Sequence, residues 1–530
     1  MLDKELLCME GAKKTVKTAG FMIIATLLAK FMGMYRDVLF AALYGTSGEA
    51  VAYMTASRIP LLFFDIALGT AISSSFIPVF NEFLQKGKKK EAQEFSNSFL
   101  NIIFLITTVL CALGILFRSP IVNLLGSGLA QNIKELSAVL VTVMFPSMIF
   151  TALAYSLTGV LQSFGSFNAP AAISLASNGI MVGYLLIFGN RFGIYGVSFA
   201  MLIAWSFQLF VLIPSLVRNK YQYRFKINFK NPGLKKALFL ALPILVSSWV
   251  QPINTMVNMF LASFIEEGQA VSALEYANKL YIIFVGVLTY AVSNLIFPSI
   301  SRLAADGNKK DEFSKLMQSS ISVVLFVLLP IMLVFLAEHT EIIRFVYERG
   351  EFGSYQTNLT ATALFWYSFG MLGYGLQEML NKAFYAEQNG KTPMRISVVG
   401  IFLNVILSFL LVRGLKLGIA GLPMAASVAA NFIAVTLAVI LNRKYPIFNR
   451  VFFGNLLKIL ISGAVMCVAI LLLKNVLVFD DNFLGRFLTL LIPSMVGGVL
   501  YLICAAALRT EEFKTAMTLL KKGRNETDGK

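Results

Sequence analysis

Four basic residues interrupt segments of the chain that are otherwise almost wholly apolar: Lys30, Arg36, Arg58 and Lys279. A basic side chain that faces lipid costs about 2.5 to 3.5 kcal/mol on the membrane-insertion scale, so these four are expected to face protein or water. A guanidinium holds a phosphate through two parallel hydrogen bonds, and an ammonium binds it as a point charge. The four residues therefore predict a binding site for phosphate or carboxylate.

Carboxylates occur on the same predicted helices as the cations. Ion pairing within the protein is therefore a structural alternative to anion binding. The candidate supporting carboxylates are Asp37, Asp65 and Glu275. At Arg36, pairing with the acid that follows it and anion binding are equally good interpretations, whereas anion binding is favoured at Arg58 and Lys279. Lys382 has Glu378 four residues earlier, a spacing that predicts an ion pair within one helix.

The segments that carry these residues are long enough and apolar enough to cross a membrane. The chain has 530 residues, of which 57% are hydrophobic and 14% are charged, whereas soluble domains carry about 25% charged residues. Apolar runs of the length that crosses hydrocarbon, about 20 residues, recur from Phe21 to Leu508. Because lipid offers the backbone no hydrogen-bond partner, and because the runs lack the alternation of barrel strands, each run is expected to be a helix.

We predict an all-α polytopic membrane protein with about fourteen transmembrane helices. The first predicted span covers about 19–44, the seventh 237–264 and the tenth 357–386. The predicted domains are an N-lobe with spans 1 to 6 (1–217), a basic cytoplasmic linker (218–236), a C-lobe with spans 7 to 12 (237–442), and a last segment with spans 13 and 14 and a cytoplasmic tail (443–530).

The two predicted lobes repeat one another in sequence at an offset of about 220 residues. Arg58 and Pro78 in the first lobe correspond to Lys279 and Pro298 in the second. Because six is even, the two units have the same orientation, and parallel repeats of this kind carry their substrate site between the units. Arg58 and Lys279 are then expected on opposite walls of a cationic cavity.

The distribution of basic residues predicts the orientation in the membrane. Most of the 45 lysines and arginines fall in segments that face the cytoplasm if the N-terminus lies there, so both termini are expected to be cytoplasmic. Topology and attraction to anionic lipid headgroups explain much of the net charge of +17. We therefore predict the membrane bilayer as a partner and no nucleic acid.

Residues for catalysis are missing from the sequence. It has no P-loop, no HExxH motif and no cysteine pair, and its one histidine, His339, falls in a predicted outer segment. We therefore predict no enzyme activity, no catalytic residue, no metal and no cofactor. Energy for transport would come from an ion gradient, the membrane potential or a partner.

Four motifs together resemble the MurJ/MviN lipid II flippase family. They are GMYRD (33–37), the stretch from Ser57 to Phe83, VYERGEF (346–352) and AFYAEQNGKTP (383–393). The likeness covers nearly the whole chain. The family belongs to the multidrug, oligosaccharidyl-lipid and polysaccharide exporter superfamily, whose fold has two six-helix lobes.

The resemblance implies translocation of lipid II, the undecaprenyl-diphosphate-linked precursor of peptidoglycan, from the inner to the outer leaflet of the bacterial cytoplasmic membrane by alternating access. It implies a cationic central cavity for the diphosphate, with the family's essential basic positions on Lys30, Arg36 and Lys279 and a further cation at Arg58. It also implies a groove for the lipid tail between the last two spans. The cell-wall synthesis machinery is a further expected partner.

Three positions depart from the family's pattern, with Val51, Phe64 and Ile282 where charged residues are usual. These departures leave open the alternative that the protein exports another lipid-linked oligosaccharide or polysaccharide. A multidrug exporter is a weaker alternative, because a positive cavity disfavours cationic drugs. A membrane-embedded transferase would need a general base or a metal-binding carboxylate cluster, and a scaffold would tolerate neutral residues in place of the embedded cations.

Overall fold

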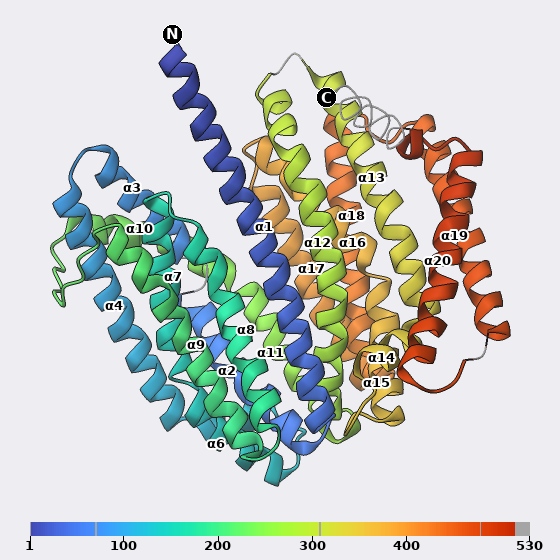
Figure 1. The fold of residues 1–530 in the computed structure, drawn as a ribbon, viewed down its shortest axis with the longest axis horizontal. Coiled ribbons are helices and arrows are strands. Elements are labelled where there is room, and N and C mark those ends of the chain that lie inside the picture. The colour runs from blue at the N-terminus through green and yellow to red at the C-terminus, as the bar shows by residue number, and fades with distance from the viewer. Residues whose placement is uncertain (1, 69–71, 307–308, 478, 515–530) are drawn as a thin grey trace. The chain divides into compact units, whose positions relative to one another are not determined.

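A computed structural model describes residues 2–68, 72–306, 309–477 and 479–514 (Figure 1). Helices make up nearly all of these residues, and no strand occurs among them. The predicted all-α fold is thus confirmed. Of the predicted C-terminal segment, residues 515–530 lie outside the described part of the chain.

The chain divides into two compact units, Met1–Ser272 and Ala273–Lys530. The predicted C-lobe begins earlier, at 237. Helices α10 (Pro232–Ser248) and α11 (Val250–Ala262) pack within the first unit, where α11 contacts helices of the N-lobe. The predicted lobe boundary at this position stays a prediction.

In the first unit, α1 packs on α8, α8 on α9, α2 on α6 and α7 on α9. Besides α10 and α11, its elements are α1 (Leu2–Tyr44), α2 (Gly48–Ala67), the π-helical turn η1 (Ile72–Phe76), α3 (Ile77–Gln85), α4 (Lys89–Leu116), α5 (Arg118–Leu125), α6 (Gln131–Met144), α7 (Ser147–Ser163), α8 (Asn168–Phe188), α9 (Gly193–Arg218) and the 3₁₀ turn η2 (Glu266–Gly268).

Local sequence explains the boundary between α1 and α2. Gly45 follows α1 with a positive φ of 54°, a conformation that glycine adopts without strain. The Ser47 side chain then accepts a hydrogen bond from the Ala50 amide at 3.3 Å and caps α2, and Glu49 lies in the first turn, where a negative charge favours the helix dipole. The two spans that carry Arg36 and Arg58 are therefore joined by a short, well-defined turn.

In the second unit, α17 packs on α18, α16 on α18, α13 on α19, and α19 on α20. Its elements are α12 (Gln269–Ala305), which begins at the end of the first unit, α13 (Lys310–Ala337), α14 (His339–Tyr347), α15 (Ser354–Ser368), α16 (Met371–Ala386), α17 (Lys391–Phe409), the π-helical turn η3 (Leu410–Gly414), the 3₁₀ turn η4 (Gly418–Ala420), α18 (Gly421–Lys444), α19 (Arg450–Val476) and α20 (Phe483–Ala507).

The order of elements repeats between the units. In the first unit the long α4 is followed by the short α5, the broken pair α6 and α7, and then α8 and α9. In the second unit the long α13 is followed by the short α14, the pair α15 and α16, and then α17 and α18. The sequence repeat therefore has a counterpart in the succession of helices, and α19 and α20 follow outside it.

Ten helices in the described chain are long and apolar enough to cross a membrane, or eleven if α6 and α7, bent by 41°, form one span. The three other predicted spans fall on α1, on α10 with α11, and on α15 with α16, which are helical but not among these candidates. The number fourteen stays a prediction.

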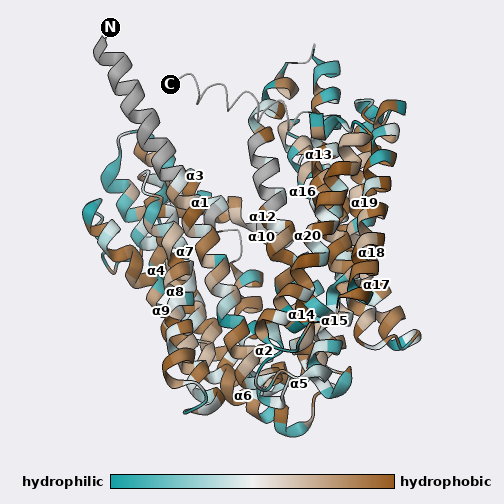
Figure 2. Cartoon of the chain, turned by 45° about the vertical axis from the view of Figure 1, so that its right-hand side comes forward, coloured by the Kyte–Doolittle hydropathy of each residue, from teal (hydrophilic) through white to brown (hydrophobic). Residues whose placement is uncertain are grey.

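Apolar side chains on several spans are exposed rather than buried. Figure 2 shows brown, apolar residues along much of α17, α18 and α19. Exposed examples are Phe402, Ile406, Val468, Leu472 and Ile503. Large exposed apolar surfaces of this kind mark contact with lipid or protein rather than with water.

Candidate functional site

Arg36 is held by side chains of its own helix and of α8. Its Nε and Nη2 donate to Oδ1 of Asp37 at 3.0 and 2.8 Å, and its Nη1 donates to Oδ1 of Asn178 at 2.9 Å. The Arg36 and Asp37 side chains are only 19% and 10% exposed. Three directed contacts at low exposure fix the orientation of the guanidinium plane. Of the two interpretations of Arg36, this structure shows the ion pair.

Asn178 explains why the GMYRD motif begins with glycine. Its amide nitrogen donates to the backbone carbonyl of Ala29 at 3.1 Å, so this side chain bridges two turns of α1 around Gly33. A Cβ atom at position 33 would lie 3.3 Å from the same nitrogen, closer than ordinary van der Waals contact. Glycine thus lets α8 approach α1 closely enough for Asn178 to reach Arg36. Asn178 was not among the predicted site residues, although an asparagine inside an apolar span is a signal of a polar contact.

Lys30 and Arg58, the other candidate cations of the first unit, are both half-buried. Arg58 lies on α2 and interacts electrostatically with Asp65, seven residues later on the same helix. The moderating role of Asp65 stays a prediction. Whether Lys30 and Arg58 bind substrate stays a prediction.

Lys279 lies on α12 in the second unit. Its Nζ is 3.7 Å from Oε1 of Glu275, with the two side chains 30% and 24% exposed. The distance is long for a charge-assisted hydrogen bond, so the pair constrains Lys279 weakly. Lys382, on α16, lies 3.8 Å from Glu378, as its spacing predicted.

Among the departures from the family pattern, two are well packed. Val51 is fully buried, and Phe64 is 5% exposed with its ring 5.7 Å from the ring of Tyr155. An arginine at position 64 would bury its charge among these aromatic side chains. Ile282, on α12, is instead 51% exposed.

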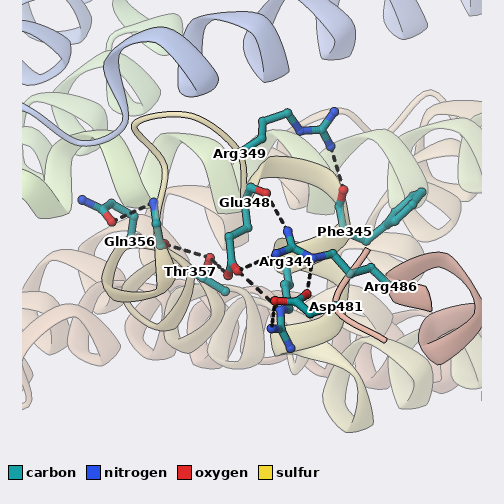
Figure 3. Close-up of polar contacts among 9 residues, drawn as sticks. Arg344, Phe345, Glu348, Arg349, Gln356, Thr357, Asp481 and Arg486 are labelled. Carbon is teal, nitrogen blue, oxygen red and sulfur yellow. Dashed lines mark hydrogen bonds and ion pairs between the residues drawn. The ribbon is translucent and has the colours of Figure 1, made fainter. Parts of the chain in front are cut away.

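The VYERGEF motif forms a dense polar network with the segment that leads into α20 (Figure 3). Glu348 accepts a hydrogen bond from Thr357 at 2.6 Å and lies 3.4 Å from both Arg344 and Arg486. Asp481 lies 3.0 Å from Arg344 and 2.6 Å from Arg486, and the Arg486 side chain holds the pKa of this carboxyl below its usual range. We call Arg344, Glu348, Asp481 and Arg486 the clasp. It ties the loop after α14 to the start of α20.

Glu338, between α13 and α14, is a buried carboxylate that the sequence analysis missed. It is 0% exposed, and neither carboxylate oxygen has a hydrogen-bond partner in the described part of the chain. Burial raises its pKa to about 7; Lys474 opposes this rise and Glu341 adds to it. Lys474 itself lies 3.2 Å from Glu341. A glutamate at the end of a long apolar run gave no signal that it would be buried.

The described residues contain no group of three or more histidine, cysteine, aspartate or glutamate side chains that could hold a metal ion. The arrangement therefore presents paired and half-buried cations rather than a cluster of acids. Such groups can bind an anion by charge.

The comparison with protein families decides the classification. A family described as lipid II flippase MurJ matches residues 40–505. The chain belongs to the lipid II flippase MurJ family. The family's description as a flippase names a transport function, so the prediction of a non-enzymatic protein is confirmed, and the chain is a multi-span membrane protein.

Individual MurJ relatives agree along most of the chain. A lipid II flippase MurJ of Thermosipho africanus is 30% identical over 453 residues, which cover 85% of this chain and 89% of the relative. A probable lipid II flippase MurJ of Buchnera aphidicola subsp. Schizaphis graminum is 29% identical over 421 residues, covering 79% and 80%.

Solved structures show the same fold. A structure described as lipid II flippase MurJ in an inward closed conformation has a TM-score of 0.76 and 28% identity, and covers 92% of this chain and 98% of that one. An inward-facing multidrug transporter of the MATE family has a TM-score of 0.68 at 13% identity, covering 80% and 98%, and so shares the fold alone. The predicted resemblance to the MurJ family is confirmed.

Proposed function

We propose that this protein is a flippase for lipid II, the undecaprenyl-diphosphate-linked peptidoglycan precursor, which it moves from the inner to the outer leaflet of the bacterial cytoplasmic membrane. The observation that carries the proposal is the MurJ family match over residues 40–505. Alternating access fits the similarity in fold to a transporter structure described as inward-facing. Both termini are cytoplasmic in this proposal.

The substrate-binding cations are Lys30, Arg36, Arg58 and Lys279, which bind the diphosphate in the course of transport. The partial exposure of Lys279, whose side chain is 30% exposed, supports this role, because a diphosphate can approach an ammonium that is not fully buried. Arg36 also links α1 to α8 through its hydrogen bond to Asn178. Substrate binding shifts the populations of the two states only if its affinity for them differs.

Depletion in the host tests the function. When the protein is removed, complete lipid-linked precursor is expected to accumulate in a form that an externally added enzyme cannot reach. Wild type should restore accessibility, whereas Arg58→Ala and Lys279→Ala should fail to do so at equal membrane levels. Lys382→Ala is the matched control, because this embedded cation pairs with Glu378 and lies 5.4 Å from the ring of Phe297.

Two outcomes would overturn the proposal. Unchanged accessibility in a strain without another flippase would exclude lipid II transport. Accumulation of an incomplete lipid would indicate a transferase instead.

An exporter of another lipid-linked oligosaccharide is the second candidate, favoured by the apolar residues Val51, Phe64 and Ile282 at positions where charge is usual in the family. Competition distinguishes the two candidates. Excess lipid II should inhibit transport by the first kind of protein and leave transport by the second unaffected.

A further inference from the structure

The segment between α9 and α10, residues 219–230, has no regular helix or strand and runs along α4. We call it the strap. It follows the end of one candidate membrane span, α9, and lies against the N-terminal half of another, α4. The strap therefore lies at a face of the membrane.

A polar row on α4 fixes the course of the strap. Asn97 donates to the carbonyl of Gln222 at 3.1 Å, and Asn101 donates to the carbonyls of Arg224 and Lys226 at 3.2 and 3.1 Å. Both asparagines are at most 5% exposed. An extended backbone has no ladder partners of its own, and these amides provide them.

Two tyrosines of the strap point back to the same row. The Tyr221 hydroxyl donates to Oδ1 of Asn97 at 2.9 Å and lies 2.9 Å from the hydroxyl of Ser96, and the Tyr223 hydroxyl donates to Asn101. Burial raises the pKa of Tyr221 to about 12, so this hydroxyl remains a neutral donor. The strap is thus pre-ordered, and a ligand that binds its outer side need not order it.

The outer side of the strap combines cations with exposed aromatic rings. Phe225 is 73% exposed and Phe229 is 74% exposed, and the side chains of Arg224, Lys226 and Lys230 between and beside them are exposed as well. Rings at this exposure are unfavourable in water. Aromatic side chains beside basic ones at the end of a span are typical of the headgroup region of a bilayer.

The charge of the strap is not neutralised by the protein. The sequence from Arg218 to Lys236 contains seven basic residues and no acidic one. Among the described residues, an ion pair is found for Lys236, with Glu82 of α3, but for none of the other six. The sequence predicts a basic cytoplasmic linker for this segment. Its exposed phenylalanines distinguish it from a linker that contacts only water.

We propose that the strap is a binding surface for anionic phospholipid: Arg224, Lys226 and Lys230 bind the headgroup phosphates, and Phe225 and Phe229 insert at the boundary with the acyl chains. This role is independent of the transported substrate.

The test uses the full chain in bilayers with equal amounts of phosphatidylglycerol and phosphatidylcholine. Trp205, Trp249 and Trp366 are replaced by Phe, and Phe225→Trp provides the reporter on the strap. Bromine, which quenches tryptophan fluorescence on contact, is placed on the acyl chains of one lipid or of the other. We expect strong quenching that is at least twofold greater when phosphatidylglycerol carries the bromine.

Neutralising the strap should abolish that preference. Arg224→Gln, Lys226→Gln and Lys230→Gln together are expected to equalise quenching by the two lipids, and high salt should do the same in the unaltered strap. Lys88→Gln, Lys89→Gln and Lys90→Gln, which neutralise an exposed basic run at the start of α4, should leave the preference intact.

Absence of quenching by either lipid would overturn the proposal and indicate a protein partner on the strap. Equal quenching by both lipids before neutralisation would overturn the part played by the cations. Because the tryptophan replacements could disturb folding, native mass spectrometry of the otherwise unaltered chain gives a second measurement: the triple Gln variant of the strap must retain fewer phosphatidylglycerol molecules than the Lys88–Lys90 control.

Discussion

The two units hold the charges of their apolar helices differently. In the first unit, Arg36 makes three directed contacts of 3.0 Å or less, one of them to another helix. In the second unit, Lys279 lies 3.7 Å from a carboxylate one turn away on its own helix, and Glu338 is buried without a hydrogen-bond partner in the described chain. Short, directed contacts fix the orientation of a charged group, whereas a long ion pair constrains it less.

The repeat makes this difference informative. When Pro170 is aligned with Pro393, the residue of α17 that corresponds to Asn178 is Ile401. In this alignment α17 has an apolar isoleucine at the position where α8 has the asparagine that bridges to α1. The repeated series of helices, α4 to α9 and α13 to α18, thus differ at this position.

Exchanging arginine and lysine at the two positions should affect the stability of the protein very differently. Arg36→Lys removes the planar fork that contacts Asp37 and Asn178 together, so we expect the free energy of unfolding to fall by about 3 kcal/mol. Lys279→Arg should change it by less than about 1 kcal/mol, because the pair that it alters is long. Equilibrium unfolding in mixed micelles measures both, and equal losses would contradict the account. Asn178→Leu should reproduce part of the Arg36→Lys loss.

The pH dependence of stability should reveal Glu338. Its pKa in the folded protein, about 7, is higher than the ordinary value of 4.5, so between these values the folded state binds more protons than the unfolded state. Stability is therefore expected to fall as pH rises, by about 2 kcal/mol between pH 5 and pH 7. Glu338→Gln should flatten this dependence, and Glu351→Gln, at an exposed position, should leave it unchanged. A dependence that survives Glu338→Gln would assign the effect to another group.

The second unit also contains closely spaced ion pairs, in the clasp, but these lie at helix ends. Glu348→Ala leaves Arg344, Arg486 and Thr357 without this shared partner. Since the arginines are partly exposed, the expected loss is only about 1 kcal/mol, with faster hydrogen exchange in the first turns of α20. Glu351→Ala in the same loop is the control. Unchanged exchange in α20 would show that the clasp does not hold this helix.

The length of the apolar runs and the repeat in the sequence predicted the helices well. Runs of about 20 apolar residues can satisfy their backbones in lipid only as helices, so the all-α fold followed from sequence. The intrahelical pair of Lys382 and Glu378 followed from spacing alone. The family followed from four motifs, of which GMYRD and VYERGEF now have structural explanations in the Asn178 bridge and the clasp.

Breaks and long-range contacts were not predictable in the same way. The stretch that begins at Ser57 ends its helix at Ala67 and resumes with a π-helical turn at Ile72, whereas the corresponding α12 continues through Pro298 to Ala305. Three consecutive serines, Ser73 to Ser75, occur in the first stretch only, and serine is a residue type that disfavours a regular helix interior. The packing of Asn178 on α1 and the burial of Glu338 depend on tertiary contacts that no local pattern encodes.

Transport by the purified protein tests the central claim most directly. In liposomes, wild type should move a fluorescent lipid-linked disaccharide pentapeptide across the bilayer faster than protein-free liposomes do. Arg58→Ala and Lys279→Ala should lower the initial rate about 10- to 100-fold, the loss of one charge-assisted phosphate contact, and Lys382→Ala should leave it nearly unchanged. No transport by wild type, or equal rates for all three variants and wild type, would contradict a lipid II flippase that works through embedded cations.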